Sequence, residues 1–204
     1  MAAPVLIDTD PGIDDALALL LAWGSPEISV EAITTVAGNV SVEQGMVNVF
    51  RLLALRKPTP HPVVALGAAE PLARPLVTAQ RYHGEDGLGD LTDWPETEKP
   101  PLEHDAVSVI IDQARRSQRL LTLVALGPLT NLALTLKADA GAVSLIGRIL
   151  RWAAPWTCPA TSRRRRSSTC TWTPRPPIGC SPRGCPCTWC RSTRRGRPSC
   201  RGPA

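Results

Sequence analysis

The sequence predicts an α/β protein with an open, mostly parallel, Rossmann-like sheet that carries helices on both faces. Two observations support this prediction. Residues 4–150 alternate short runs of β-branched residues with longer segments in which apolar residues recur every three or four positions. Strands that alternate with helices in this way pair in parallel and are covered on both faces. In such sheets, ligands bind at the carboxyl ends of the strands.

The expected elements follow one another in order along the first part of the chain. The expected strands are residues 5–7, 28–36, 63–66 and 120–126. The expected helices are residues 13–23, 42–53, 107–114 and 129–136. Ser41 is the expected N-cap of the second helix, and Gln44 follows it at the spacing of a capping box. Residues 67–101 exceed an ordinary connection in length, so we expect them to carry function or short helices.

Composition divides the chain near residue 150. Residues 1–150 hold all 18 acidic residues and 11 basic ones, a formal charge of 11 − 18 = −7, whereas residues 151–204 hold 12 arginines and no acid, giving the net +5 of the whole chain. All 7 cysteines also follow residue 150. The first part therefore needs no disulfides, and no apolar run approaches the roughly 20 residues of a membrane span. We expect a cytoplasmic protein that does not enter a membrane.

The tail, residues 151–204, lacks the pattern of a folded segment. Ile178 is its only Leu, Ile, Val, Met or Phe, and arginine, proline and cysteine dominate it, so we expect it to be disordered. Such a composition is typical of GC-rich codons translated out of frame. Synonymous codons from Arg151 onward, read one nucleotide out of register, can encode LGGAVDVPGNVTPAAEFN, which restores strand and helix periods. We interpret the tail as a frameshift product, which the DNA sequence around codon 151 would test.

The segment from Asp8 to Asp15 is the most informative part of the sequence. It reads Asp-Thr-Asp-Pro-Gly-Ile-Asp-Asp, with four carboxylates between a buried strand and a helix. Carboxylates so close together repel one another, and a hard divalent cation such as calcium binds several of them at once. The alternative is that Asp14 and Asp15 only complement the positive end of the helix, a surface effect of a fraction of a kcal/mol. Because two acids directly follow an apolar strand, we favour a metal site.

Four segments in order resemble the nucleoside hydrolases of the inosine-uridine preferring type. The first is the acidic segment, continued by Ala16. The others are Thr35-Val36-Ala37-Gly38-Asn39, His83-Gly84-Glu85-Asp86-Gly87-Leu88 and Leu126-Gly127-Pro128-Leu129-Thr130-Asn131-Leu132. The resemblance covers residues 4–150 and implies a calcium-dependent enzyme that cleaves the N-glycosidic bond of a ribonucleoside into free base and ribose.

The resemblance also implies roles for residues of the acidic segment. Asp10 matches the metal-bound general base that activates the attacking water. Asp15 matches a bidentate calcium ligand, and Asp8 a supporting acid of the metal cluster. Leu126 falls where the family offers a backbone carbonyl to calcium.

Three further residues match positions that bind or assist the substrate. Asp14 and Asn39 match residues that hold the ribose hydroxyls. His83 matches a histidine near the base in family members that prefer pyrimidines, where it could assist the leaving group. The alternative for His83 is a loop histidine without a role. The residues do not indicate which base is preferred.

The second half of the family's site has no counterpart in this sequence. The family adds ribose-binding Asn and Glu residues and a further Asp ligand there, whereas no Asp, Glu, Asn or His follows Leu150. We therefore expect impaired hydrolysis. The alternative is an inactive homologue that serves as a binding or assembly partner. Full-length members of the family form dimers or tetramers.

A different class of function takes the basic tail at face value. Residues 163–166 are four arginines, tryptophans are scattered through the tail, and Cys187 and Cys190 have C-x-x-C spacing. A structural zinc site needs four ligands in usable pairs, and the other cysteines lie at irregular distances with no histidine. We therefore expect no specific nucleic acid partner.

Overall fold

The computed structural model describes residues 2–97, 104–153 and 168–172. Its strands are β1 (Ala3–Thr9), β2 (Ile28–Thr35), β3 (Val63–Ala65), β4 (Thr122–Ala125), β5 (Arg148–Ala153) and β6 (Ser168–Trp172). Its helices are α1 (Ile13–Gly24), α2 (Val42–Arg56), α3 (Gln80–His83), α4 (Ala106–Arg116), α5 (Thr130–Ala138) and α6 (Ala140–Ser144).

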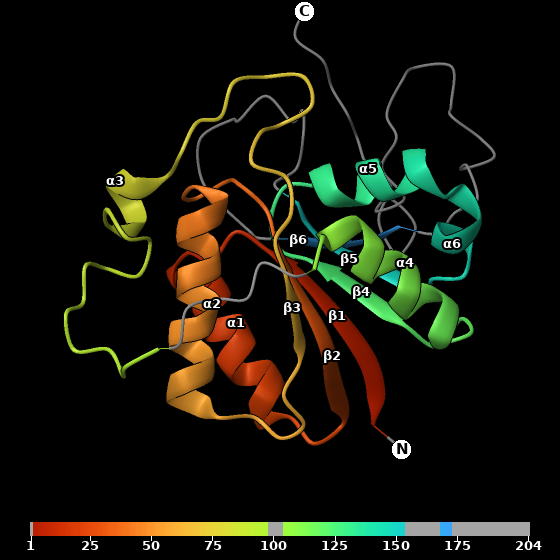
Figure 1. Ribbon diagram of the computed structural model, residues 1–204, viewed down its shortest axis with the longest axis horizontal. Helices are drawn as coiled ribbons and strands as arrows, with labels where there is room; N and C mark the ends of the chain where they lie inside the picture. Colours follow the sequence, from red (N-terminus) through yellow and green to blue (C-terminus); the bar gives the residue numbers. More distant parts are fainter. Residues whose placement is uncertain (1, 98–103, 154–167, 173–204) are drawn as a thin grey trace, which may run out of the picture. The chain divides into compact units, whose positions relative to one another are not determined.

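The six strands form one sheet in the order β3-β2-β1-β4-β5-β6. Strands β1 to β5 pair in parallel, and β6 pairs antiparallel with β5. The chain builds outward from β1 through β2 to β3 and then crosses back to place β4 on the other side of β1 (Figure 1). The strand order therefore reverses between β1 and β4, and ligands of open α/β sheets bind at such a switch point.

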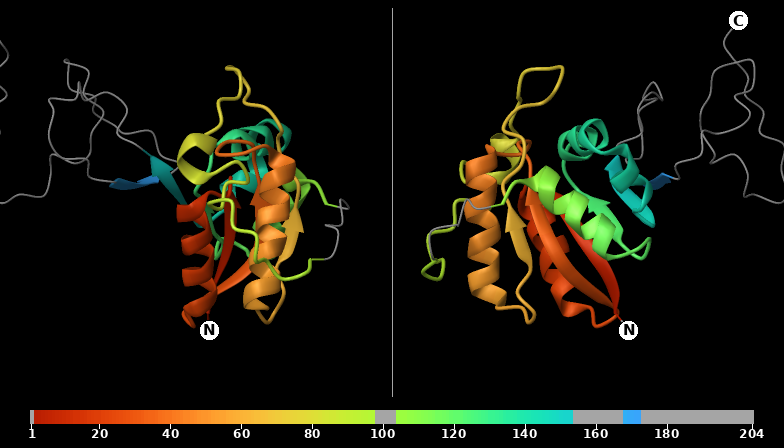
Figure 2. Two further views of the ribbon diagram at one scale, coloured as in Figure 1. Left: turned by 90° about the vertical axis from the view of Figure 1, so that its left-hand side faces the viewer. Right: turned by 45° about the vertical axis from the view of Figure 1, so that its right-hand side comes forward.

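Helices cover both faces of the sheet, as the sequence predicts (Figure 2). On one face, Leu19 of α1 and Val49 of α2 pack against Ile7 and Ile33 in a buried apolar cluster. On the other face, helices α4, α5 and α6 enclose a second cluster around Leu6, Leu121, Leu123, Ile110 and Val143. Neighbouring residues of β1 alternate between the two clusters, as the period of a strand requires. The predicted α/β fold is confirmed.

The expected helix caps are present in part. Ser41 caps α2, since its side chain accepts a hydrogen bond from the Gln44 backbone at 3.3 Å. The Gln44 amide does not return to Ser41 to complete a capping box, and instead donates to Asn48 Oδ1 at 3.0 Å. Asp105 caps α4 by accepting from the Ser108 backbone at 3.0 Å.

The structure changes the expectation for part of the tail. Arg151–Ala153 continue β5, and Ser168–Trp172 form β6, so disorder does not extend over the whole of residues 151–204. Threonine and tryptophan favour extended backbone, and the edge of β5 offers unpaired hydrogen-bonding groups to such a segment. The remaining expectations for the tail, including the arginine run and the C-x-x-C pair, concern residues outside those that the structure describes.

None of the described helices is both long enough and apolar enough to cross a membrane.

Candidate active site

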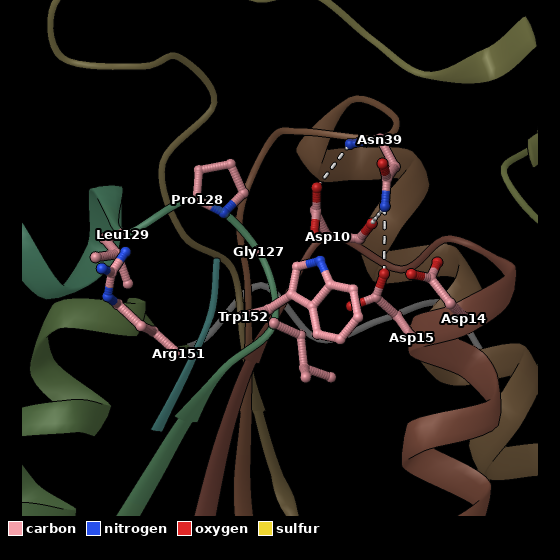
Figure 3. Close-up of a pocket in the computed structure, with 10 residues that line it drawn as sticks. Asp10, Asp14, Asp15, Asn39, Gly127, Pro128, Leu129, Arg151 and Trp152 are labelled. Atoms are coloured by element: carbon pink, nitrogen blue, oxygen red, sulfur yellow. Dashed lines mark hydrogen bonds between the residues drawn. The ribbon is translucent and has the colours of Figure 1, made fainter. Parts of the chain in front are cut away.

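A pocket of about 570 Å³ opens at the carboxyl ends of the central strands (Figure 3). The loop after β1 contributes Asp10, the first turn of α1 contributes Asp14 and Asp15, and the loop after β2 contributes Asn39. Its opposite wall consists of residues 126–129 after β4, with Arg151 and Trp152 of β5. Segments far apart in the sequence therefore meet at the switch point of the sheet. Five of the predicted site residues line the pocket there, namely Asp10, Asp14, Asp15, Asn39 and Leu126.

Asp10 and Asp15 are buried carboxylates held by directed hydrogen bonds. Asp10 Oδ2 accepts from the Asn39 backbone at 2.8 Å. Asp15 Oδ1 accepts from the Thr9 hydroxyl at 2.9 Å, and its Oδ2 accepts from the Gly12 backbone and from Asn39 Nδ2, both at 3.2 Å. Asp10 and Asp15 are only 6% and 5% exposed. These bonds fix both carboxylates beside the pocket without neutralising them.

Asn39 holds both ends of residues 10–15, which run from the end of β1 into the first turn of α1 and are called the acidic loop below. Besides its bonds to the two carboxylates, its Nδ2 donates to the Asp10 backbone carbonyl at 3.0 Å. The adjacent Gly38 is required for this arrangement, because a Cβ there would overlap the Asp10 side chain. A Cβ at Gly127 would lie 2.7 Å from Asp10 Oδ1, so the opposite wall also approaches this carboxylate closely. Glycine at positions 38 and 127 therefore leaves room for the Asp10 side chain.

Burial changes the protonation of this pair. Desolvation raises the pKa of Asp10 to about 7, and the charge of Asp15 adds to the rise. Burial likewise raises the pKa of Asp15, against the hydrogen bonds from Gly12 and Thr9. Two carboxylates that resist ionisation side by side favour either a shared proton or a bound cation.

Asp8 lies apart from the other acids of the segment. It is fully buried, and its Oδ1 accepts from the Thr34 hydroxyl at 2.6 Å and from Asn131 Nδ2 at 2.7 Å. Burial raises its pKa to about 6 despite these bonds, and its Oδ2 has no hydrogen-bond partner among the described residues. Asp8 is not among the residues that line the pocket. Its expected role as a supporting acid of the metal cluster stays a prediction.

Asp14 and His83 occupy the outer part of the site. Asp14 is exposed and lines the pocket, where its carboxylate is free to meet a ligand. His83 ends α3, and its Nδ1 accepts a hydrogen bond from the Ile13 backbone at 3.3 Å. A Cβ on Gly12 would lie 3.0 Å from the His83 ring and 2.8 Å from Asn39 Nδ2, so the imidazole packs against the acidic loop. His83 is not itself a lining residue of the pocket.

The residues present fit part of a site for a hard divalent cation. The described residues contain no group of three or more His, Cys, Asp or Glu side chains placed to hold a metal ion. Asp10 and Asp15 supply two buried carboxylates, and Leu126, whose backbone carbonyl is the further expected donor, lines the same pocket. Oxygen donors of these kinds suit calcium, which takes six to eight of them. The described part of the chain thus offers an incomplete but chemically consistent donor set.

Two residues that support the site were not assigned a role from the sequence. Asn131 is fully buried at the start of α5 and donates to Asp8 and to the Thr35 carbonyl, the latter at 2.8 Å. Its Oδ1 accepts from the Ala68 backbone at 2.9 Å. Thr34 supplies the other donor to Asp8. A polar residue at a helix start and a threonine in a strand are both common at the surface, so neither residue type predicts a buried supporting role. Only the motif around Asn131 could have indicated its role.

The fold and the site together define a parallel α/β protein with a carboxylate-lined pocket at the switch point of its sheet. The chain belongs to the family of inosine-uridine preferring nucleoside hydrolases, whose family model matches residues 5–151. This match confirms the resemblance seen in the four motifs.

Relatives with known names agree with the family assignment. The pyrimidine-specific ribonucleoside hydrolase RihA of Escherichia coli O1:K1 / APEC is 45% identical over 150 residues, which cover 74% of this chain and 48% of that protein. RihA of Klebsiella pneumoniae shows the same identity and coverage. The chain therefore spans about half the length of the curated relatives it matches.

Solved structures resemble the same part of the chain. A plant nucleoside hydrolase, PpNRh1, superposes with a TM-score of 0.69 at 35% identity and covers 76% of this chain and 49% of its own. The purine-preferring ribonucleoside hydrolase of Gardnerella vaginalis gives a TM-score of 0.66 at 32% identity, over 73% of this chain and 48% of its own. Proteins named for purine and for pyrimidine substrates thus share this fold.

Proposed function

We propose that this chain carries the metal-binding and water-activating half of a ribonucleoside hydrolase, which cleaves the N-glycosidic bond to free base and ribose. The convergence of Asp10, Asp15 and Asn39 in one pocket is the observation that carries the proposal. The proposal is also supported by the family and by the relatives, which are named for ribonucleoside hydrolysis.

Asp10 is the general base of the proposed reaction. Its Oδ2 is occupied by the Asn39 backbone, whereas its Oδ1 faces the Gly127 wall and receives no hydrogen bond from another described residue. A water molecule in the pocket can donate to this free oxygen and transfer its proton there as it attacks the anomeric carbon. Positioned proton transfer of this kind contributes roughly 10²–10⁴-fold to a rate.

Asp15 and Leu126 complete the proposed calcium site with Asp10. Calcium, when bound, would supply positive charge that lowers the pKa of a coordinated water. Asp15 is suited to bidentate coordination because both of its oxygens are held in place by the Thr9, Gly12 and Asn39 donors. Pre-set ligands reduce the cost of ordering the site when the cation binds.

The sugar and the base are handled by the outer residues. Asp14 is proposed to accept hydrogen bonds from the ribose hydroxyls, with Asn39 beside it. As the glycosidic bond breaks, its electron pair leaves with the base, which must gain a proton, while the ribose passes through an oxocarbenium-like transition state. His83 is proposed to stand on the side of the departing base. The pocket geometry supports no preference between purine and pyrimidine.

Ribose release from inosine and from uridine, measured by reducing-sugar assay with calcium and with a chelator, tests the proposal. We expect little turnover by the 204-residue chain, and clear calcium-dependent turnover once the segment after Leu150 is translated in the alternative frame. Asp10→Asn in the active form should abolish it. If the alternative-frame protein binds calcium but releases no ribose, the hydrolase proposal is wrong and a role as a binding or assembly partner is favoured.

A further inference from the structure

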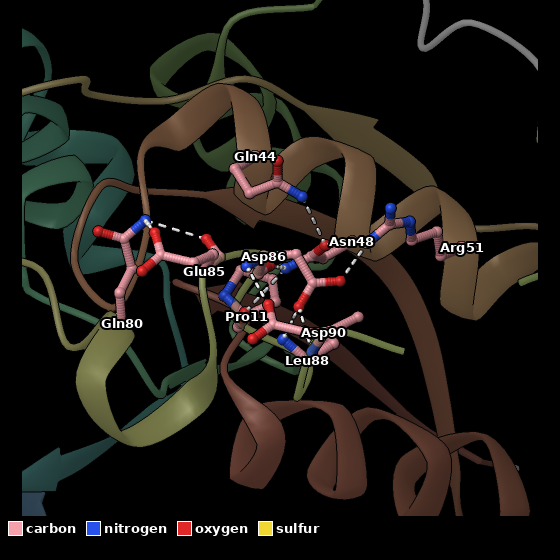
Figure 4. Close-up of polar contacts among 9 residues, drawn as sticks. All are labelled: Pro11, Gln44, Asn48, Arg51, Gln80, Glu85, Asp86, Leu88 and Asp90. Carbon is pink, nitrogen blue, oxygen red and sulfur yellow. Dashed lines mark hydrogen bonds and ion pairs between the residues drawn. The ribbon is translucent and has the colours of Figure 1, made fainter. Parts of the chain in front are cut away.

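One side chain of helix α2, Asn48, contacts both the acidic loop and the loop of residues 84–90, which follows His83 (Figure 4). Asn48 lies in the middle of α2 and is fully buried. Its Nδ2 donates to the Pro11 carbonyl at 3.2 Å and to the Asp86 carbonyl at 2.7 Å. An asparagine inside a helix has no intrinsic advantage there, so these two tertiary bonds account for its position.

The loop of residues 84–90 is closed around Asp86. Asp86 Oδ1 accepts from the backbones of Leu88 at 2.8 Å and Asp90 at 3.0 Å, and its backbone donates to Asp90 Oδ1 at 3.0 Å. Leu88 inserts into the apolar cluster beneath. Burial acts to raise the pKa of Asp86, but the hydrogen bonds from Leu88 and Asp90 and its pairing with Arg51 outweigh it and leave the pKa lowered. The loop is therefore a preformed unit and not a slack connection.

Arg51, one turn after Asn48, clamps the same loop from outside. Its guanidinium pairs with Asp86 Oδ2 at 2.8 Å and lies 5.6 Å from the centre of the Trp94 ring. The Arg51 and Asp86 side chains are 23% and 18% exposed, so solvent weakens this pair only in part. Arg51 thus holds the loop to α2, but it makes no recorded contact with the acidic loop.

Two glycines allow these segments to approach one another. Gly87 has φ of +83°, and a Cβ there would lie 3.1 Å from the Pro11 carbonyl oxygen and 3.2 Å from Asn48 Nδ2. Gly45 lies one turn before Asn48, and a Cβ there would lie 3.2 Å from Pro11 Cδ. The helix, the acidic loop and the Gly87 backbone therefore meet at van der Waals distance around the Asn48 amide.

From this convergence we propose that Asn48 is a positioning residue that sets the His83 imidazole against the acidic loop. His83 is tied to its own loop by the Gly89 amide, which donates to the His83 carbonyl at 2.7 Å, and to the acidic loop by the Ile13 amide. Asn48 fixes the distance between those two loops by bonding to both. The inference deepens the proposed function, on which the catalytic value of His83 rests, but the coupling itself concerns only the geometry of this chain.

The coupling has a definite signature in the protein without substrate. Replacing Asn48 with alanine removes both donors and leaves the Pro11 and Asp86 carbonyls without their partner. We expect the amides of Ile13 and Gly89 to exchange with solvent at least about tenfold faster, because loss of the two Asn48 hydrogen bonds lowers the free energy of local opening. The ring nitrogen resonance of His83 Nδ1 should shift toward that of an imidazole without a hydrogen-bond donor.

Controls separate positioning from general loss of stability. Gln44→Ala removes a bond to Asn48 Oδ1 on the same helix but leaves both loop contacts intact, so it should change neither the Ile13 amide nor the His83 resonance. Val109→Ala, in the apolar cluster on the other face of the sheet, lowers global stability and should leave the His83 resonance unchanged. Arg51→Gln removes the 3.4 Å bond from Arg51 to Asn48 Oδ1 and the pairing with Asp86, but it keeps both Asn48 bonds to the loops. It should therefore accelerate Gly89 alone, and it serves as a milder variant if Asn48→Ala fails to fold.

Hydrogen exchange and nitrogen NMR on the full 204-residue chain decide the matter. Concerted loss of protection at Ile13 and Gly89 with a displaced His83 resonance in Asn48→Ala, absent in both controls, supports the proposal. An unchanged His83 resonance in Asn48→Ala, or an equal shift in Val109→Ala, overturns it. If Asn48→Ala does not fold, equal acceleration of Ile13 and Gly89 in Arg51→Gln overturns it, and acceleration at Gly89 alone supports it. Because these measurements use no substrate, their outcomes can be interpreted even if the proposed hydrolysis is wrong.

Discussion

The two walls of the pocket are built in different ways. On the β1–β2 wall, Asp10 and Asp15 receive hydrogen bonds from Asn39, Thr9 and Gly12, all within the first 39 residues. On the β5 wall stand Arg151, an arginine that carries a fixed positive charge, and Trp152, which is 53% exposed. Among the described residues, neither side chain enters a recorded hydrogen bond. On the β1–β2 wall the carboxylates are held in place by hydrogen bonds, whereas the β5 wall begins the arginine-rich segment.

The largest effect is expected from replacing the β5 wall. The segment after Leu150, translated in the alternative frame, should raise calcium-dependent ribose release by at least roughly a thousandfold, because groups of an active site act as a unit. Reducing-sugar assays on both proteins at equal concentration measure the difference. Equal rates would mean that the β1–β2 wall suffices and that the contrast between the walls is unimportant. Genomic DNA that reads in a single frame into the arginine-rich tail would refute the frameshift interpretation.

The stability of the metal-free chain should fall as pH rises. Asp10 and Asp8 have pKa values raised to about 7 and about 6, so the folded state holds protons that the unfolded state releases near pH 4. The free energy of unfolding is therefore highest below about pH 4 with respect to these groups, and the Asp10 shift alone lowers it by about 4 kcal/mol between about pH 4 and about pH 7. Chemical denaturation without calcium measures this slope, and Asp10→Asn should flatten it.

We expect calcium binding to restore the free energy of unfolding that is lost as pH rises, and to do so through the carboxylates of the β1–β2 wall alone. Asp15→Asn removes a carboxylate that three donors hold beside Asp10. We expect the calcium dissociation constant of this variant to rise by more than about 100-fold, because loss of a charged ligand costs more than the roughly 10–100-fold effect of losing a supporting residue. Asp14→Asn is the matched control, because Asp14 is adjacent and acidic but exposed. Isothermal titration calorimetry compares the two. A similar loss in both variants would indicate that calcium responds only to net charge.

A smaller effect tests the close packing around Asp10. Gly38→Ala places a methyl group against the Asp10 carboxylate, and should destabilise the fold by about 1–3 kcal/mol and weaken calcium binding. Gly24→Ala, at the end of α1, meets nothing within 4 Å and should be neutral or slightly stabilising. Thermal unfolding with and without calcium measures both. If Gly38→Ala is tolerated as well as Gly24→Ala, Asp10 is not held as tightly as the hydrogen bonds indicate.

The sequence predicted the fold through patterns that repeat. Apolar residues that recur every three or four positions predicted α1, and the β-branched run around Ile33 predicted β2, because burial dictates both periods. The buried face of α1 is centred on Leu19, whereas Ile13 and Leu17 of the predicted apolar face are exposed. The short helix α6 and the strand β5 were not predicted, and α3 was expected only as one of the possible short helices within residues 67–101. Helices of four and five residues contain too few turns to show a period, and β5 crosses the boundary where composition changes.

The site was predictable where residues of one kind cluster in sequence. The closeness of Asp10, Asp14 and Asp15 in the sequence predicted them as site residues, and the motif that contains Asn39 predicted Asn39. Asp8 belongs to the same cluster, yet the structure directs it toward Asn131, because residue identity does not reveal which buried donors a carboxylate faces. Asn131 and Asn48 contribute through contacts 123 and 37 residues away along the chain, to Asp8 and Pro11. Such long-range partners follow from the folded geometry and not from any local pattern.

The hydrogen bonds that orient the buried acids have a consequence for how the protein forms during translation. Among the described residues, the donors to Asp8, Asp10 and Asp15 all come from residues no later than Asn131. Chains are synthesised from the amino terminus, and early segments fold first when their contacts are complete. The carboxylate wall can therefore take shape on the ribosome once α5 has emerged, without any of these donors coming from the residues after β5.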